Sequence, residues 1–282
     1  MGSRQKVLCV TMERTRPFLK WAGGKYRCLE QVINALPKGK RLVEPFAGSG
    51  VVFLNASYPD FLLTDSNQDL IVLYQYLQSE GTRFIHYCAR FFCDKNNQSD
   101  IYYQYRIEFN NSKLGTRRRA ALFLYLNRHG YNGLCRYNLS GQYNVPFGRY
   151  IKPYFPQQEL ELFSQKSQSA KFVHADFEST FENTQTGDVI YCDPPYVPLS
   201  KTSQFTTYTR HGFGESEQMR LAALAKTAAS QNIPVIISNH DTPFTRDLYQ
   251  GASEMISFSV RRNISCKGSQ RLTVRELIAI FT

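Results

Sequence analysis

The chain contains the run Val189-Ile190-Tyr191-Cys192-Asp193-Pro194-Pro195-Tyr196, in which apolar residues are followed by an acid, two prolines and a tyrosine. The apolar part is typical of a buried parallel strand that opens into a loop, and active sites of open α/β sheets gather at such strand ends. Because prolines fix φ and donate no N–H, the carbonyls of this loop stay free. Asp193 and the Pro194 carbonyl could then accept both hydrogens of an amine on a base ring, and Tyr196 could stack on that ring. An ordinary proline-rich turn would also explain two prolines, so the other motifs have to decide.

The composition favours a polyanionic partner. The 282 residues carry a formal net charge of +11, with a pI of about 9.3, and 14% of them are aromatic. Such a charge attracts nucleic acid, and aromatic rings can stack on its bases. The seven cysteines include no Cys-x-x-Cys pair and no metal-like spacing, so we expect reduced thiols, no metal and a cytoplasmic protein. The apolar run 7–10 is too short for a signal peptide or a membrane span.

Strand and helix signals alternate along the chain and predict a three-layer α/β fold. Residues 1–16 are polar and basic and are expected to be a disordered tail. Residues 17–66 and 164–282 contain the strand signals and are predicted to form one domain. Residues 67–163 have mainly helical periodicity and are predicted to be an insertion, which includes a polar hairpin at 127–150.

The first predicted strand, 42–44, runs into a glycine loop and then into the apolar start of a helix. Gly48 and Gly50 form the loop of this strand, loop and helix unit, although a single pair of glycines is weak evidence for a ligand. Asp65 ends the next strand, fifteen residues past Gly50, where an acid can accept from ribose hydroxyls. A nicotinamide-type loop would require a third glycine at the position of Phe53. The pattern therefore favours an adenosine-bearing ligand without a pyrophosphate, such as S-adenosylmethionine.

Further strands are predicted at the apolar runs 61–64, 171–174, 235–238, 255–260 and 277–281. The last two are expected to pair as a hairpin. Asp176 and Phe177 follow one of these runs and would supply a carboxylate and a ring for an adenine moiety. Residues 201–214 form a long polar stretch and are expected to be a mobile flap.

Within the insertion, two apolar stripes are predicted to face the core: Leu70, Ile71, Tyr74 and Leu77, and Ala120, Ala121, Leu124 and Tyr125. The basic run 117–119 is expected to be a solvated face, although it could contact phosphates. Residues 127–150 hold four glycines among polar and aromatic side chains. Such a segment is expected to bury little and to act as a binding hairpin.

Five motifs together resemble the Dam family of DNA adenine methyltransferases, in the order found in its α class. They are Phe18-Leu19-Lys20-Trp21-Ala22-Gly23-Gly24-Lys25, Glu44-Pro45-Phe46-Ala47-Gly48-Ser49-Gly50, Tyr131-Asn132-Gly133-Leu134-Cys135-Arg136-Tyr137-Asn138, Asn144-Val145-Pro146-Phe147-Gly148-Arg149-Tyr150 and Asp193-Pro194-Pro195-Tyr196. The resemblance covers nearly everything after Arg16. It implies a Rossmann-like, S-adenosylmethionine-dependent methyltransferase fold, in which 17–66 and 164–282 are the catalytic domain and 67–163 is the target-recognition insertion.

The resemblance implies methyl transfer from S-adenosylmethionine to the amino group of an adenine flipped out of double-stranded DNA, with GATC as the site. Catalysis would rest on Asp193, Pro194 and Tyr196. The cofactor site would be lined by Trp21, Lys25, Phe46, Gly48, Gly50, Asp65, Asp176, Phe177 and Asp193. DNA would be bound by Lys20, Tyr131, Asn132, Leu134, Arg136, Pro146, Arg149 and Tyr150. A monomer that acts at the nucleoid in the cytoplasm, without a metal, is expected.

Two alternatives stay open on the sequence alone. The chain could methylate adenine in another DNA site or in RNA; enzymes for cytosine or glutamine more often begin the last motif with Ser or Asn, so Asp193 favours adenine. It could also be a DNA-binding regulator that has kept the fold and lost catalysis. An intact Asp193, Tyr196 and glycine loop argue against such a loss.

Overall fold

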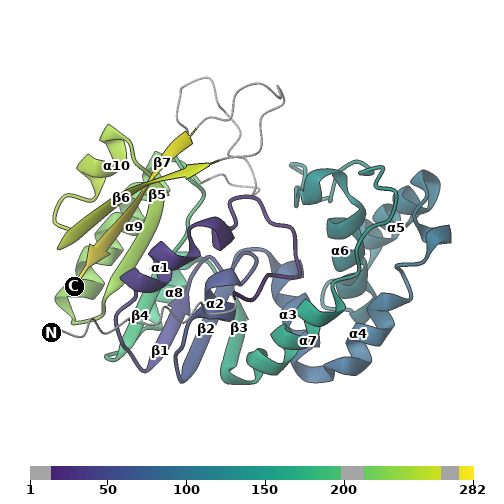
Figure 1. The fold of residues 1–282 in the computed structure, drawn as a ribbon, viewed down its shortest axis with the longest axis horizontal. Coiled ribbons are helices and arrows are strands. Elements are labelled where there is room, and N and C mark those ends of the chain that lie inside the picture. Colours follow the sequence, from purple (N-terminus) through teal and green to yellow (C-terminus); the bar gives the residue numbers. More distant parts are fainter. Residues whose placement is uncertain (1–13, 198–212, 262–272) are drawn as a thin grey trace, which may run out of the picture.

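Seven strands form one mixed sheet in the computed structural model, which describes residues 14–197, 213–261 and 273–282. The strands are β1 (Arg41–Glu44), β2 (Asp60–Asp65), β3 (Ala170–His174), β4 (Asp188–Cys192), β5 (Val235–His240), β6 (Glu254–Arg261) and β7 (Thr273–Phe281). Their order across the sheet is β3-β2-β1-β4-β5-β7-β6 (Figure 1). Only β7 is antiparallel to its neighbours, β5 and β6. The chain order reverses between β1 and β4, and ligands of open α/β sheets bind beyond the carboxyl ends of the strands at such a point.

The sheet separates two cores. Leu42 and Tyr191 contribute to one core, while Val43 and Ile190 contribute to the other. Every residue of β4 and β5 is buried, as expected for central strands that are covered on both faces. The predicted strands, including the terminal hairpin of β6 and β7, are confirmed, and so is the three-layer α/β fold.

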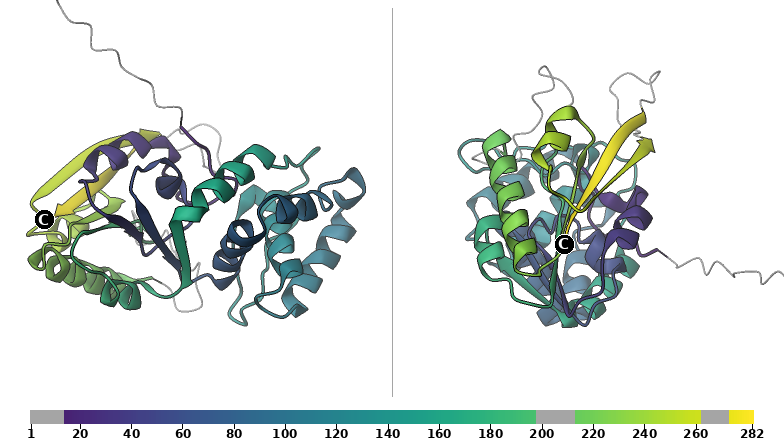
Figure 2. Two further views of the ribbon diagram at one scale, coloured as in Figure 1. Left: turned by 90° about the horizontal axis from the view of Figure 1, so that it is seen from below. Right: turned by 90° about the vertical axis from the view of Figure 1, so that its left-hand side faces the viewer.

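Helices cover both faces of the sheet, and the right-hand view of Figure 2 shows the sheet between them. One face carries α1 (Leu29–Ala35), α2 (Val51–Asn55) and α3 (Gln68–Glu80). The other face carries α8 (Phe177–Glu182), α9 (Glu215–Ser230) and α10 (Pro243–Leu248). Short 3-10 helices are η1 (Lys25–Arg27), η2 (Asp94–Asn96), η3 (Tyr131–Gly133) and η4 (Ser167–Ser169).

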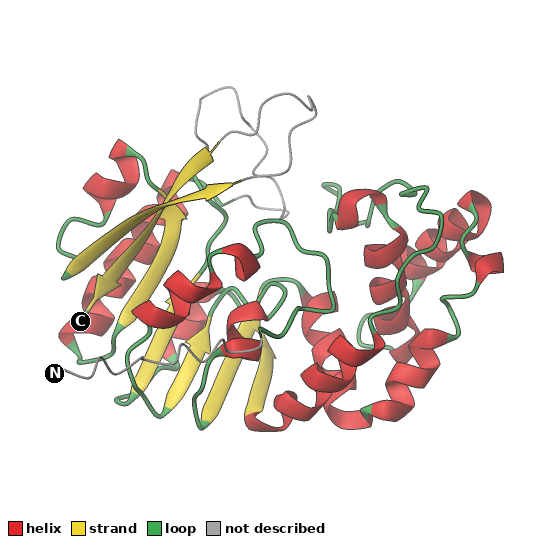
Figure 3. Cartoon of the chain, in the orientation of Figure 1, coloured by secondary structure: helices red, strands yellow, loops and turns green. Residues whose placement is uncertain are grey.

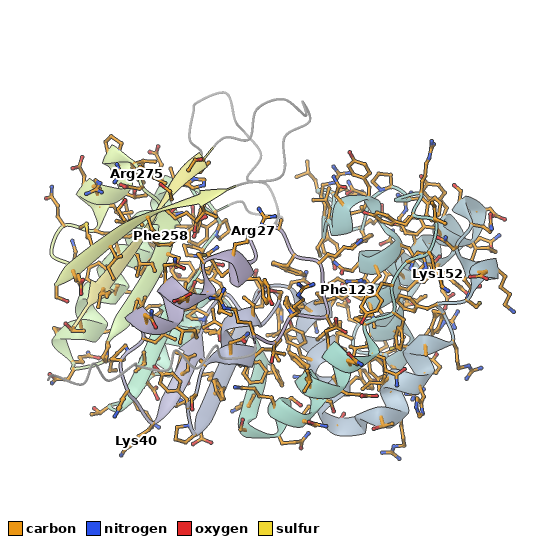
Figure 4. The ribbon with its side chains drawn as sticks, in the orientation of Figure 1. Arg27, Lys40, Phe123, Lys152, Phe258 and Arg275 are labelled. Atoms are coloured by element: carbon orange, nitrogen blue, oxygen red, sulfur yellow. The ribbon has the colours of Figure 1, made fainter. Side chains whose placement is uncertain are left out.

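The segment between α3 and β3 forms a helical half beside β3 (Figure 3). Its helices are α4 (Thr82–Ala89), α5 (Ser99–Asn111), α6 (Arg117–His129) and α7 (Gln157–Lys166). Both predicted apolar stripes are buried, and the core that covers one face of the sheet continues through α3 into this half. Phe123 of α6 belongs to this shared core (Figure 4). Because α3 packs on both β3 and α6, the two halves are held together as one body.

The prediction of a solvated face at residues 117–119 was wrong for Arg119, whereas the Arg117 and Arg118 side chains are 36% and 42% exposed. Arg119 is buried and forms an ion pair with Asp69 of α3, with Nε 2.6 Å from Oδ1, and it also donates to the Ser112 carbonyl (2.9 Å). Arg117 and Arg118 pair with glutamates of neighbouring helices. The cause is tertiary: a guanidinium at the start of α6 meets a carboxylate that the sequence places fifty residues earlier.

The polar segment 127–150 also buries more than expected. Tyr143 and Val145 are fully buried in the shared core, and Asn110 of α5 accepts from Tyr143 N (2.8 Å). The segment is a loose hairpin, with single antiparallel bridges between Tyr137 and Tyr143 and between Gly130 and Phe147. Its inner side chains pack, whereas its outer ones are free to contact a partner.

The predicted N-terminal tail and the predicted flap lie mostly outside the described residues. Residues 1–13 of the predicted tail and residues 198–212, which include most of the predicted flap, lie outside them. The last part of the predicted tail packs on the fold, since Arg14 pairs with Glu30 (2.6 Å) and Thr15 N donates to Asn55 Oδ1 (2.9 Å).

Candidate active site

Asp193 is the first residue after β4, at the edge of the sheet where β1, β4 and β5 end. Gln218 Nε2, from α9, donates to the Pro195 carbonyl (2.8 Å) and holds the loop against the sheet. Within the described residues, no group donates to the Pro194 carbonyl. A carboxylate and a carbonyl that no described group uses therefore lie next to each other on this loop.

The end of β5 fixes the far side of this loop. Asn239 Oδ1 accepts from Val197 N (3.3 Å), and Asn239 Nδ2 donates to Gln218 Oε1 (3.1 Å). His240 Nδ1 lies 2.7 Å from the Val197 carbonyl oxygen. Asn239 and His240 were not predicted, although the polar run 238–241 ends a buried apolar strand and is a signal of the same kind as the loop after β4. Gln218 was not predicted either, because it lies in α9.

Asp193 forms an ion pair with Lys25. The two atoms, Oδ1 and Nζ, are 2.7 Å apart, and the side chains are 23% and 4% exposed, respectively. Lys25 Nζ also donates to the Gly23 carbonyl (2.7 Å) and lies 4.4 Å from the centroid of the Tyr196 ring. Burial raises the pKa of Asp193 to about 6; Lys25 opposes this shift and the charge of Glu276 adds to it. The carboxyl is thus ionised at neutral pH and takes up a proton not far below it.

Tyr196 is held by Glu276 of β7. Its hydroxyl donates to Glu276 Oε2 (3.3 Å), and its ring packs edge-on against His240, with centroids 4.7 Å apart. The Cys28 thiol donates to the same glutamate oxygen (3.7 Å). Glu276 was not predicted, because its only signal in the sequence is a single acid before the apolar run 277–281.

The glycine loop is tied to the end of β2. Gly48 and Gly50 have φ of 48° and 67°, which the tight turn between β1 and α2 requires. Gly48 N donates to Asp65 Oδ2 (3.0 Å), and Asp65 Oδ1 accepts from Asn67 N (2.8 Å). Burial raises the pKa of Asp65. The Trp21 ring covers the loop, since a Cβ at Gly48 would lie 3.1 Å from Trp21 Nε1.

Three phenylalanines meet beside this loop. Phe46 stacks on Phe177 with centroids 5.7 Å apart, and Phe213 contacts both rings at 5.6 Å. Phe213 was not predicted, because it follows a polar stretch with no periodicity. Asp176 is exposed, and its Oδ1 accepts from Ser179 N (2.8 Å) at the start of α8, so one carboxylate oxygen serves as a helix cap.

Glu44 is the last residue of β1 and directly precedes the glycine loop. Its side chain is 2% exposed, and Oε1 has no hydrogen-bond partner among the described residues. Burial raises the pKa of Glu44 to about 8, and the charge of Asp193 adds to the shift. A buried carboxyl oxygen without a partner is costly unless a ligand satisfies it.

Lys20 connects this site to the hairpin. Lys20 Nζ lies 4.0 Å from the centroid of the Tyr150 ring, and the Tyr150 hydroxyl accepts from Asn132 N (3.0 Å). Burial lowers the pKa of Lys20, and the positive charge of Arg128 adds to this effect. Three of the predicted DNA-binding residues are thus in contact with one another.

The other predicted DNA-binding residues lie along the same hairpin. Tyr131 is 50% exposed, and its N–H donates to the Pro146 carbonyl (2.9 Å). Arg136 Nε donates to Asn144 Oδ1 (2.7 Å), so this guanidinium is supported by its own hairpin. Leu134 is half-buried against the core, whereas Pro146 and Arg149 are exposed.

Residues 21–264 match the family model "D12 class N6 adenine-specific DNA methyltransferase". The chain belongs to this family. It is 50% identical over 272 residues to the DNA adenine methylase of Vibrio cholerae serotype O1, a match that covers 96% of this chain and 98% of that protein. It is 48% identical to the DNA adenine methylases of Escherichia coli K12, over 96% of each chain, and of Serratia marcescens, over 96% of this chain and the whole of that protein.

Membership of this family confirms the resemblance to Dam proteins and identifies the chain as an adenine-specific DNA methyltransferase with the Rossmann-like methyltransferase fold. Among the described residues, no three or more His, Cys, Asp or Glu side chains are grouped so that they could hold a metal ion. None of the described helices has the length and the apolar character needed to cross a membrane.

Proposed function

We propose that this methyltransferase transfers a methyl group from S-adenosylmethionine to the exocyclic amino group of adenine in GATC, in double-stranded DNA. The observation that carries the proposal is the pair formed by the Asp193 carboxylate and the Pro194 carbonyl, to which none of the described residues donates, at the switch point of the sheet. Two acceptors side by side match the two hydrogens of an amino group, which would leave the nitrogen lone pair available.

The residues around the glycine loop fit S-adenosylmethionine. This group supplies an electrophilic methyl on a sulfonium. The loop of Gly48 and Gly50 under the Trp21 ring would admit its amino-acid part, and the unpartnered oxygen of Glu44 suits a cationic group there. Asp65 would accept from the ribose hydroxyls with its remaining lone pairs.

The adenine moiety would lie against the rings of Phe46 and Phe177, both of which also contact Phe213. The free oxygen of Asp176 would accept from an amino group of this moiety. Lys25 would act differently from the other predicted cofactor residues, because its ammonium is already paired with Asp193 and orients that carboxylate.

A target adenine in duplex DNA must leave the stack to reach a pocket at a strand end, at a cost of a few kcal/mol. Tyr196 would stack on the flipped base and offset part of this cost, since base–aromatic contacts are worth ~1–3 kcal/mol each. The exposed Tyr131 and Asn132 would fill the space that the base leaves.

Recognition of the site would rest on the hairpin and Lys20. Arg136 and Lys20 are proposed to contact guanine, because cations pair with its O6 and N7 in the major groove. Leu134 and Pro146 would contact the thymine methyl. Arg149 and Tyr150 would contact the backbone beside them, and the enzyme would act as a monomer at the nucleoid in the cytoplasm.

The catalytic proposal is tested with Asp193→Ala. We expect turnover to fall about a hundredfold or more, because a preorganised acceptor is lost, while cofactor binding changes much less. Transfer of a labelled methyl group to duplex DNA measures this, with Asp247→Ala, an exposed acid on α10, as the matched control. Activity within a few-fold of the parent would remove Asp193 from the mechanism, and a parent without any transfer would favour a DNA-binding regulator.

The site is tested by the methylation pattern of plasmid DNA from a methylase-free host that expresses the chain. Arg136→Ala should raise methylation of sites altered at one outer base pair relative to GATC, since a base contact is worth ~1–3 kcal/mol of discrimination. Arg220→Ala, an exposed and ion-paired arginine of α9, is the control. If Arg136→Ala lost activity equally on matched and altered sites, Arg136 would hold phosphate and the assignment would be wrong.

A further inference from the structure

Asn127 joins two segments that are far apart in the sequence. It lies in the last turn of α6 and is 1% exposed. Its Oδ1 accepts from Lys20 N (3.0 Å), and its Nδ2 donates to the Lys20 carbonyl (2.7 Å) and to the Gly133 carbonyl (3.2 Å). One carboxamide thus holds both backbone groups of Lys20 and the first turn of the hairpin.

The same two segments are also in direct contact. A Cβ at Gly133, where φ is 62°, would lie 2.2 Å from the Cβ of Lys20, so the lysine stem lies on the bare glycine backbone. Lys20 Nζ then lies over the ring of Tyr150, further along the hairpin. Backbone and side chain of Lys20 are therefore both fixed relative to the hairpin. Neighbouring Arg128 adds a bond from Nη1 to the Phe18 carbonyl (3.3 Å).

We propose that Asn127 is a positioning residue for DNA recognition, which sets Lys20 in register with the hairpin so that both segments contact the site as one surface. This inference rests on the proposed contact of Lys20 with a base. Only an amide offers an acceptor and two donors on one rigid plane, as the three bonds to Lys20 and Gly133 require. A base contact needs such support, because a displacement of about 1 Å is enough to spoil it.

The test compares relative methylation of duplexes in which the site is randomised one base pair at a time. Asn127→Asp keeps the acceptor for Lys20 N and removes both donors. Against the parent, we expect its preference at the base pair contacted by Lys20 to fall about tenfold, with preference at the other positions unchanged.

The matched control is Gln78→Leu, which also removes a carboxamide that connects two elements. Gln78 Nε2, from α3, donates to the carbonyls of Ser167 and Ala170 (2.7 Å for the latter), away from the hairpin. This variant should lose thermal stability and keep the parent's preference at every position. If Asn127→Asp behaved in the same way, its role would be structural and the inference wrong.

A double-mutant cycle checks whether Asn127 acts through Lys20. In a Lys20→Met background, Asn127→Asp should cause little further loss of preference, whereas independent effects would add and contradict the inference. Gly133→Ala displaces Lys20 without removing a buried polar group and should relax the same base pair, which keeps the test decisive if Asn127→Asp does not fold. A parent that prefers another sequence would overturn GATC alone, because relaxation is measured against whatever site the parent prefers.

Discussion

Two charged side chains, Lys25 and Glu276, shift the pKa of Asp193 in opposite directions. This pKa determines the pH range in which we expect the enzyme to be active. The Asp193 carboxylate must be ionised to accept both a hydrogen bond and partial positive charge from the reacting amine. The pKa of Asp193 in the free enzyme then appears in the pH dependence of kcat/KM. Because burial raises the pKa of Asp193 to about 6, we expect activity to fall as the pH drops through that value. The measurement is labelled methyl transfer between about pH 5 and 8.

Variants of Lys25 and Glu276 should move this fall in activity at acidic pH, the acidic limb of the pH profile, in opposite directions. Lys25 lowers the pKa of Asp193 and Glu276 raises it, so Lys25→Met should shift the limb to higher pH and Glu276→Gln to lower pH. Glu276→Gln keeps an acceptor for the Tyr196 hydroxyl, which separates charge from positioning. A limb that stays in place in both variants would mean that Asp193 is not the titrating group.

Single residues were predictable from the sequence where a motif places them at a strand end. Asp193 and Asp65 are examples, since Asp65 is the last residue of β2 and Asp193 directly follows β4. Glu276, Asn127 and Gln218 were missed for one physical reason. Each acts on a partner more than twenty residues away or across the sheet, and no local periodicity records such a contact.

At the level of elements, hydrophobic periodicity and composition predicted the strands correctly, but they did not predict the burial of Arg119 at the start of α6. Strands β4 and β5 are continuous apolar runs, so their burial follows from the sequence. Nothing in the local sequence distinguishes Arg119 from a surface arginine, because its partner, Asp69, lies in α3. The Tyr137 hydroxyl donates to the same carboxylate (2.9 Å). The ion pair therefore ties the hairpin to α3 and α6, which local propensity cannot predict.

The hairpin 127–150 was predicted as a binding element from its glycines and polar side chains. Its inner face nevertheless packs, because Tyr143 and Val145 alternate with outward-facing residues. Alternation over so few residues, without regular strands, gives a weak signal. Tyr131, Arg136 and Arg149, which the sequence marks as candidates to bind DNA, are exposed on the outer face of the hairpin.

Across the whole molecule, the proposed cofactor and DNA residues lie on different parts of one continuous body. The former surround the glycine loop at the sheet edge, and most of the latter follow the hairpin, where Lys20 contacts Tyr150. Figure 1 shows the sheet and the helical half side by side. A change confined to the sheet edge should therefore alter cofactor binding without weakening the ionic contacts that hold DNA.

Asp65→Ala tests this separation. The variant loses the acceptor for Gly48 N and the proposed ribose contact, and bonds to a charged group are worth about 1.5–3 kcal/mol each, so affinity for the demethylated cofactor product should fall about tenfold or more. Calorimetry measures this, while DNA affinity at one fixed salt concentration should stay within about twofold. An unchanged cofactor affinity would reduce Asp65 to a residue that holds the Asn67 turn, and a parallel loss of DNA affinity would show that the two regions are not independent.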